Sequence, residues 1–349
     1  MSQTALARPT LVPGLVRLWR DRHTLQLGLD PTRAVLVEVA DPAAVRLLDL
    51  LDGTRSERTV LEHAARRNID RRAAESLLNA LRSAGLVIAA ATLLPAELTG
   101  PARARLRGEA AALALRGPDH PATPAAVLRR RRAARVVVTG HGRLLAPVAL
   151  ALAQAGIGHV HPDLDGRVEA ADLPGTGLTD ADLGCDRAAA VAALIERTAP
   201  GTTTTALRRG ATLVVQGGTD RPAALLATGY AQRRQAHLLL GVRDGVPIVG
   251  PLVRPPVGPC LNCLDLHRCD RDPAWPALAA QLATAPRDEP CALAPLLTAV
   301  ALATAEALTL IDGGLPDTVG GAVEVTAPGR MRRRGWPPHP DCDCPAGGG

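Results

Sequence analysis

Short apolar stretches typical of strands alternate with longer stretches of helical period over the first 90 residues. Val45, Leu48 and Leu51 fall on one face of a predicted helix that Asp41 can cap. Two amphipathic helices follow, and an apolar stretch closes the segment as a strand. The predicted strands are 16–19, 25–29, 34–39 and 85–89, and the predicted helices are 42–51, 56–67 and 70–84. This order predicts a small winged-helix (α+β) domain over 1–95.

The pattern changes twice after this domain. Residues 96–134 are rich in Ala, Arg, Pro and Gly without a long period, so we expect a linker with one helix at 102–115. A buried-type strand is then predicted at 136–139, followed by a glycine turn, a helix at 144–155 and a second strand that begins at Gly158 and ends at Asp163-Leu-Asp165. That succession is the mononucleotide-binding βαβ unit.

Strands and helices continue to alternate up to the last 25 residues. Such alternation predicts a doubly wound, Rossmann-like parallel sheet, with a second domain over 135–349. The further predicted strands are 203–207, 212–216, 237–242 and 321–326, and the further helices are 188–197, 222–235 and 293–310. The last helix is apolar on most faces, which implies deep burial.

Composition narrows the chemistry. The 349 residues are enough for two domains, and with no Phe, one Tyr and three Trp their cores must be aliphatic. Aromatic platforms for stacking bases are therefore not expected. All 40 basic residues are Arg, which excludes a Lys Schiff base, a P-loop Lys and a Lys general base.

Charge and cysteine usage suggest a soluble, cytoplasmic protein. The net charge is +6, but the Arg residues are scattered except at 129–132, interpreted as a solvated linker, and at 332–334, interpreted as a loop. Nucleic acid is thus not the expected partner. We find no signal peptide and no apolar run long enough to span a membrane. In a reducing compartment, close cysteine pairs point to metal.

Two cysteine pairs carry the strongest chemical signal. Cys260 and Cys263 form a Cys-x-x-Cys knuckle after Gly258-Pro, and Cys342 and Cys344 form a second pair near the chain end. Two such pairs complete a tetrahedral sulfur site for zinc. Four thiolates leave no position for water, so this zinc would be structural and would clip the tail onto the α/β domain.

Other interpretations of the cysteines stay open. The pairs could be unpaired surface thiols or a thioredoxin-like redox motif. His339, His267 or Cys269 could replace one ligand. We interpret Cys185 and Cys291 as ordinary buried thiols.

The glycine turn is a weaker signal for nucleotide binding. Gly140 and Gly142 match the dinucleotide fingerprint, but Leu145 stands where the third glycine belongs. Asp163 or Asp165 could accept ribose hydroxyl groups. A degenerate scaffold explains this pattern at least as well.

Asp220 follows the predicted strand 212–216 at the edge where α/β proteins bind ligands. It could bind Mg²⁺ or cap the helix that begins at Pro222. Capping is the more common use of Asp just before a Pro in a first helical turn.

Taken in order, the motifs between Arg135 and Cys344 resemble the ThiF/MoeB/HesA superfamily, relatives of ubiquitin-activating enzymes. Residues 9–90 are similar to PqqD-like winged domains that recognise leader peptides, through Leu50-Leu-Asp-Gly and Leu81-x-x-x-Gly-Leu-Val. Together the two parts resemble the leader-peptide-binding proteins of azoline-forming pathways, which accompany a YcaO-type cyclodehydratase. The resemblance also implies a homodimer through the α/β domain.

The chain departs from the active members of that superfamily. Residues 170–175 replace the Asn-Leu-x-Arg-Gln segment, and Arg187 is the nearest candidate for the missing Lys. The phosphate-binding set is depleted, which favours a pseudoenzyme that uses no ATP or Mg²⁺. The leading hypothesis is therefore a leader-peptide-binding scaffold. The alternatives are an adenylyltransferase that activates a carboxylate and a winged-helix DNA-binding regulator.

Overall fold

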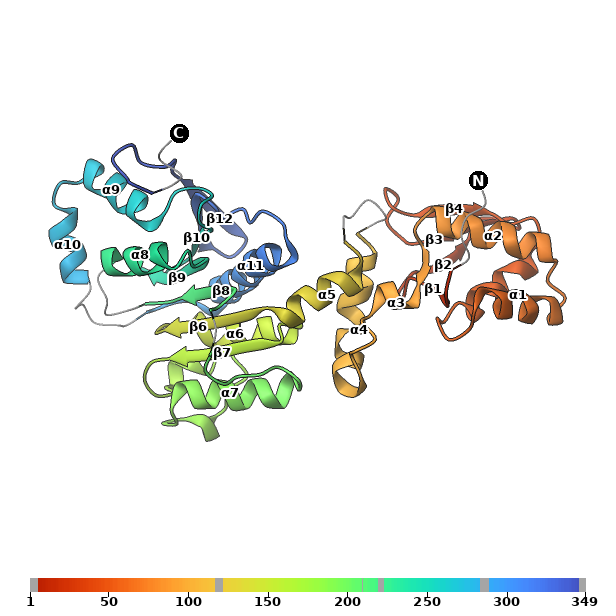
Figure 1. The fold of residues 1–349 in the computed structure, drawn as a ribbon, viewed down its shortest axis with the longest axis horizontal. Coiled ribbons are helices and arrows are strands. Elements are labelled where there is room, and N and C mark those ends of the chain that lie inside the picture. The colour runs from red at the N-terminus through yellow and green to blue at the C-terminus, as the bar shows by residue number, and fades with distance from the viewer. Residues whose placement is uncertain (1–5, 117–121, 209, 219–222, 283–288, 345–349) are drawn as a thin grey trace. The chain divides into compact units, whose positions relative to one another are not determined.

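The computed structural model describes residues 6–116, 122–208, 210–218, 223–282 and 289–344. The chain forms two compact units that divide between Arg129 and Arg130. Figure 1 follows the chain through both units. Each unit has its own buried aliphatic core.

The first unit contains two small antiparallel sheets. In one, β1 pairs with β5, and in the other the order is β2-β3-β4. The strands are β1 (Pro9–Leu11), β2 (Arg17–Trp19), β3 (Thr24–Leu27), β4 (Val35–Glu38) and β5 (Val87–Ala89). The four strands predicted here are present within two residues, and β1 is additional.

Three helices follow the small sheet, and each begins where a polar side chain caps it. They are the 3₁₀ helix η1 (Pro42–Leu50), α1 (Glu57–Arg66) and α2 (Arg71–Ser83). Asp41, Ser56 and Asp70 accept backbone N–H groups of the first turns at 2.8, 3.2 and 2.9 Å. The first predicted helix is thus a 3₁₀ helix. All three helices bury aliphatic side chains in the same core.

The segment 96–134, predicted as a linker with one helix, contains two helices. The predicted helix at 102–115 is α4 (Gly100–Ala114), and α5 (Pro124–Ala133) is additional; the short α3 (Ala90–Leu93) precedes the segment. Leu106, Ala110 and Leu113 repeat at helical spacing on α4 and are buried in a cluster that includes Leu128 of α5. Because only a narrow aliphatic stripe faces this cluster, the abundant Ala and Arg conceal the period.

The second unit is built on a seven-stranded sheet of order β12-β11-β10-β9-β8-β6-β7. The strands β7, β6, β8 and β9 are parallel, as predicted, whereas β10, β11 and β12 extend the sheet with antiparallel pairing. The strands are β6 (Arg135–Gly140), β7 (His159–Leu164), β8 (Leu213–Gln216), β9 (His237–Arg243), β10 (Val246–Val253), β11 (Gly321–Ala327) and β12 (Arg330–Gly335). The strand predicted at 203–207 is reduced to one parallel bridge between Thr203 and His159.

The antiparallel extension begins at a tight turn. Asp244 and Gly245 join β9 to β10, with φ of +51° and +80°, and Arg243 pairs with Val246 across the turn. Two positive φ values are typical of the hairpin turn that suits twisted strands. The loop predicted at 332–334 is instead part of the edge strand β12, whose residues are all exposed.

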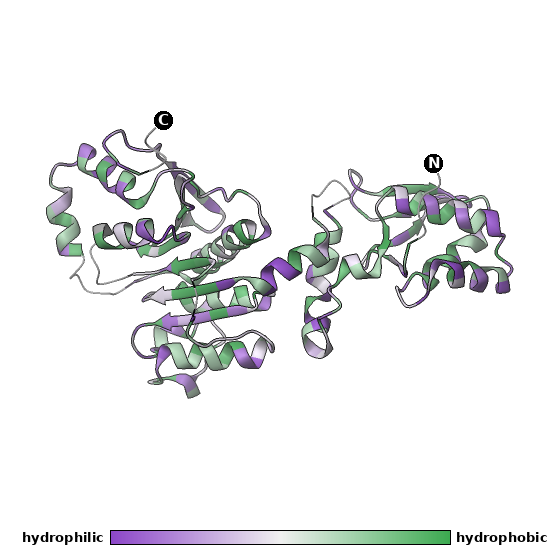
Figure 2. Ribbon diagram, in the orientation of Figure 1, coloured by the Kyte–Doolittle hydropathy of each residue, from purple (hydrophilic) through white to green (hydrophobic). Residues whose placement is uncertain are grey.

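Helices cover both faces of this sheet. Val136 and Val138 of β6 pack toward α6, α7 and α11, whereas Val137 faces the cluster that includes residues of α8 and α9. Figure 2 shows how hydrophobic the central strand β8 is. The helices are α6 (Leu145–Gln154), α7 (Arg187–Thr198), α8 (Ala223–Gln232), α9 (Leu261–Arg271), α10 (Trp275–Leu282) and α11 (Leu293–Asp312), with short 3₁₀ helices η2 (Ala170–Asp172) and η3 (Asp180–Asp182).

The late apolar helix is α11. Within the described part of the chain it is the one helix long and apolar enough to cross a membrane. Leu296, Ala299 and Ala303 nevertheless lie in the main core, and α11 packs against strands β9, β10 and β11 of the sheet. This packing is that of a core helix in a soluble α/β protein, and it agrees with the predicted deep burial.

The run 129–132 is not simply a solvated linker. Arg131 is 1% exposed, and its Nε and Nη2 donate to the two carboxylate oxygens of Asp312 at 2.8 and 2.7 Å. Arg130 donates to the Asp312 backbone carbonyl at 2.6 Å. The end of α5 is thereby attached to the C-terminus of α11, where the helix dipole also favours positive charge.

Candidate metal centre and nucleotide pocket

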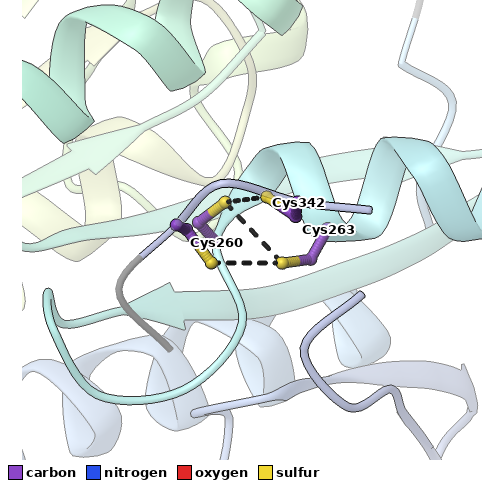
Figure 3. Close-up of side chains that lie close together, drawn as sticks. Cys260, Cys263 and Cys342 are labelled. Carbon is purple, nitrogen blue, oxygen red and sulfur yellow. Dashed lines mark hydrogen bonds between the residues drawn. The ribbon is translucent and has the colours of Figure 1, made fainter. Parts of the chain in front are cut away.

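The structure brings the four predicted metal-binding sulfurs together. Cys260 is the N-terminal capping residue of α9, Cys263 lies in its first turn, and Cys342 and Cys344 come from the tail after β12. Figure 3 shows Cys260, Cys263 and Cys342 pointing toward one another. The Sγ atom of Cys260 lies 3.8 Å from that of Cys263 and 3.6 Å from that of Cys342. The Sγ atoms of Cys263 and Cys344 lie 3.5 Å apart. All four ligand atoms lie within 4.8 Å of one another.

These separations fit a tetrahedral ion. Metal–sulfur distances of about 2.3 Å place the sulfurs of a tetrahedron about 3.8 Å apart. The thiols are free, so no disulfide competes for them. The Asn262 amide donates to the Cys342 sulfur at 3.3 Å, and the His339 backbone N–H donates to the Cys263 sulfur. Such donors stabilise thiolate ligands and fix their direction.

Burial and crowding make the cluster unfavourable for bare thiolates. Burial, followed by the Cys342 thiol, raises the pKa of Cys260 to about 12, against the opposing effect of the Cys263 backbone N–H. Burial also raises the pKa of Cys263. A divalent cation therefore has to displace protons as it binds.

His339 holds the tail loop and lies outside the sulfur set. Its Nδ1 accepts the Asp341 backbone N–H at 3.1 Å, so Nε2 donates to Asp270 at 2.8 Å. The Cys342 backbone N–H donates to the His339 carbonyl at 3.1 Å. His267 lies beside it, with Nε2 3.0 Å from the Pro337 carbonyl, and the His267, Asp270 and His339 ligand atoms also lie within 4.8 Å of one another.

Two further predictions about cysteines are corrected. Cys185 is exposed and Cys291 is only partly buried, so neither is an ordinary core thiol. Both lie in loops just before a helix, and not inside an apolar strand or helix, where a buried thiol would be expected.

The glycine turn lies where the strand order reverses, between β6 and β8. Gly140 and Gly142 have φ of +98° and +123°, a region that favours glycine. A Cβ atom on Gly140 would lie 2.3 Å from the Gly218 carbonyl oxygen. His141 and Gly218 exchange backbone hydrogen bonds of 3.0 and 2.9 Å, so the turn is fastened to the end of β8. Both glycines are thus required by the backbone itself.

Leu145 fills the place of the missing third glycine. Its side chain is 1% exposed and lies so close to Gly217 that a Cβ atom there would meet it at 2.6 Å. The third glycine of a dinucleotide-binding turn allows a helix to pack closely on the sheet, and here a leucine side chain in the core occupies that place.

The predicted acidic residues fall at different places. Asp165 lines a cavity of about 590 Å³ beside the turn, and its backbone N–H donates to the Gly140 carbonyl at 3.0 Å. Asp163 instead accepts the Thr139 hydroxyl at 2.9 Å on the exposed strand face. Strand β7 ends at Leu164, so Asp163 belongs to the strand and Asp165 to the loop that follows it. Asp220 lies outside the described residues.

Three arginines line the same cavity, Arg143, Arg167 and Arg187, and each donates to protein acceptors. Arg187 donates to Asp172 at 2.9 Å and to the Asp165 carbonyl at 2.7 Å, and the Arg187–Asp172 pair is largely buried. Arg143 donates to the carbonyls of Ala171 and Cys291 at 3.0 and 2.8 Å. Arg187 is thus paired with a carboxylate, whereas Arg143 and Arg167 donate to neutral carbonyl oxygens and keep their positive charge in the cavity.

The sequence interpretation missed Glu289, which enters the glycine turn. Its Oε2 accepts the Arg143 backbone N–H at 3.1 Å, and a Cβ atom on Gly142 would lie 2.8 Å from the same oxygen. Burial raises the pKa of Glu289, against the opposing effects of the Arg143 and Val242 backbone N–H groups. No local pattern could have identified this contact, because the partners lie 146 residues apart.

Known structures resemble nearly the whole chain, although no protein-family model and no curated protein sequence matches it. E. coli MccB with MccA-N7isoAsn is similar at a TM-score of 0.63 and 17% identity, covering 97% of this chain and 99% of that one. E. coli MccB with ATP gives 0.64 and 16%, covering 96% and 99%. PaaA gives 0.65 and 16%, covering 92% and 98%. Likeness at this identity shows the fold, and the chain therefore has the ThiF/MoeB-like α/β fold that its motifs predicted.

Proposed function

We propose that this protein binds the leader segment of a ribosomally made precursor peptide and presents the peptide to a YcaO-type cyclodehydratase. The first unit would act as a PqqD-like winged recognition domain, and the α/β unit would dock the partner without ATP chemistry. The likeness to MccB supports peptide binding, because structures of MccB contain the peptide MccA. The similarity to MccB covers 97% of this chain and therefore includes both units.

The observation that carries the scaffold hypothesis is the Glu289 carboxylate in the glycine turn. It accepts the backbone N–H that a phosphate oxygen would use at the start of α6. An incoming phosphate would meet this like charge, while Arg143 and Arg187 are held by protein acceptors. Nucleotide binding would therefore have to displace the Glu289 carboxylate from the turn.

The edge strand β2 supplies a surface for the leader. Within the described residues β2 pairs with β3 alone, so its other edge is open to a further strand. Val16, Leu18 and Trp19 are 41%, 39% and 46% exposed there. Exposed apolar edges are normally protected, which supports a peptide that adds to the sheet by backbone hydrogen bonds.

Zinc in the four-cysteine cluster belongs to the same proposal. The four sulfurs complete the coordination shell, so the ion would hold the tail and leave no open position for catalysis. The resemblance further favours a homodimer and a cytoplasmic location.

Leader binding is tested with the full chain and fluorescently labelled synthetic leaders of the precursor peptides encoded beside its gene. We expect saturable binding that weakens at least about tenfold in Trp19→Ser, because the edge loses its largest apolar contact. Leu315→Ser, at a more exposed apolar residue of the α/β unit, serves as the control. Absence of binding by every leader would refute the proposal.

The adenylating alternative makes the opposite prediction for ATP. We expect the wild-type protein to show no ATP–pyrophosphate exchange and no rise in Tm with ATP and Mg²⁺. Glu289→Ala should show a nucleotide-dependent rise in Tm, because the turn loses its internal anion. Exchange activity in the wild type would identify an adenylyltransferase instead.

A further inference from the structure

A second cavity lies away from the glycine turn, on the sheet face beside α9. Strands β9 to β12 form one wall and α9 forms the other, and the cavity measures about 530 Å³. Leu239, Ile248 and Leu264 give it an apolar lining. The nucleotide motifs and the four-cysteine cluster do not account for this space.

Four of the described arginines line this cavity. Arg334 of β12 pairs with Glu324, whereas Arg243 at the end of β9 and Arg268 and Arg271 on α9 form a separate group. Within the described part of the chain, no protein acceptor hydrogen-bonds the guanidinium groups of these three. The Arg268 guanidinium lies 4.8 Å from the centre of the Trp275 ring. Burial lowers the pKa of Arg268, and the charges of Arg243 and Arg271 add to this effect, whereas the Asp265 carboxylate opposes it. The three positive charges therefore repel one another at close range.

Two acids, Asp265 and Glu324, also line the cavity and offset part of the positive charge of its four arginines. Asp265 accepts the Trp275 indole N–H at 2.7 Å. Glu324 forms ion pairs with Arg332 and Arg334 of the edge strand. The arginines on α9 and β9 thus keep an excess of positive charge.

A further donor without an acceptor lines the same cavity. The Trp336 indole nitrogen is buried and has no hydrogen-bond partner among the described residues. Buried N–H groups are rarely left unpaired in native structures. The cavity therefore combines several free donors and positive charge with an apolar wall.

We propose that this cavity binds an acidic peptide segment in which Asp or Glu side chains alternate with aliphatic ones. Carboxylates are the acceptors that paired arginines bind best in planar, two-pronged geometry. The aliphatic side chains cover Leu239 and Ile248, which a free inorganic anion would leave bare. This proposal rests on the proposed function, because the acidic segment would be part of the same precursor peptide. The α/β unit would bind that segment in this cavity.

The experiment titrates the full chain with the synthetic peptide acetyl-Leu-Glu-Leu-Glu-Leu-amide in a calorimeter. We expect binding that weakens as NaCl is raised, because ionic strength screens the contact. The matching Gln peptide should bind at least about tenfold more weakly, since it lacks the charge of each carboxylate. Arg268→Gln and the exposed Arg271→Gln should each weaken binding of the Glu peptide by a similar factor.

Arg254→Gln is the matched control, because this exposed arginine belongs to the same unit and does not line the cavity. Equal binding of the Glu and Gln peptides, or an equal loss in Arg254→Gln, would overturn the proposal. Phosphate or succinate binding as tightly as the Glu peptide would overturn the peptide assignment. Trp19→Ser should leave this binding unchanged, so failure here is distinct from failure of leader capture by β2.

Discussion

At the scale of single residues, the pair between Arg131 and Asp312 has the clearest energetic consequence. Arg131 is 1% exposed and Asp312 11%, and the two charges meet through two parallel hydrogen bonds. Arg131 also donates to the Ala155 carbonyl at 3.2 Å. A guanidinium buried this deeply is tolerated only because its hydrogen bonds are satisfied.

We predict that Arg131→Met lowers the free energy of unfolding by about 3–5 kcal/mol, because it leaves the Asp312 carboxylate buried without its partner. Urea unfolding followed by circular dichroism measures this change. Arg130→Met is the control, and as an exposed arginine it should cost less than about 1 kcal/mol. Equal losses in both variants would show that the buried pair has no special role.

At the scale of elements, the hairpin between β9 and β10 decides where the parallel sheet becomes antiparallel. Asp244 and Gly245 both have positive φ, and the next strand returns beside β9 without a crossover helix. The turn therefore sets the register of β10.

We predict that Gly245→Ala destabilises the protein by about 1–2 kcal/mol, because the added Cβ is strained at φ of +80°. The nearest atom to that Cβ would lie at an ordinary 3.6 Å, so strain and not collision is tested. Gly108→Ala, inside helix α4 with open space around it, should instead stabilise by about 0.5–1 kcal/mol. Thermal unfolding of the two variants should thus shift Tm in opposite directions.

The elements also show what could be predicted from the sequence. Strands β6 to β9 and helices α6, α7 and α11 follow clear periods and were predicted within about three residues. Strand β10 was missed because Pro247, Gly250 and Pro251 interrupt its pattern, although Asp244-Gly245 between apolar stretches was a usable hairpin signal. Strand β12 was missed because consecutive arginines carry no apolar period. Cysteine spacing indicated which sulfurs to group, whereas the Glu289 contact depends on tertiary folding alone.

At the scale of the whole molecule, the four-cysteine cluster connects the tail to α9 across about 80 residues of chain. The Cys260–Cys342 and Cys263–Cys344 contacts span 82 and 81 positions. Closing a loop of this length restricts the unfolded chain, and a metal that binds only the folded form adds its own binding energy.

We predict that a strong chelator removes one zinc ion per chain and lowers Tm by roughly 5 °C or more, because the folded form loses its bound metal. Elemental analysis and calorimetry check both values. Apparent zinc affinity should rise with pH, because protons held by the buried thiols compete with the metal. Cys342→Ser should lose the metal, whereas Cys185→Ser should keep it; a metal-free wild type of unchanged Tm would contradict the prediction.

The arginine-rich strand β12 has a consequence for colloidal behaviour. It is the outermost strand of the sheet, and an open edge of this kind is a template on which other chains can assemble into aggregates. Every residue of β12 is exposed, and consecutive guanidinium groups at 332–334 surround that edge with positive charge. A second sheet of the same charge that approached this edge would meet electrostatic repulsion. The consecutive arginines, which hid this strand from the sequence pattern, therefore protect the protein from uncontrolled self-assembly.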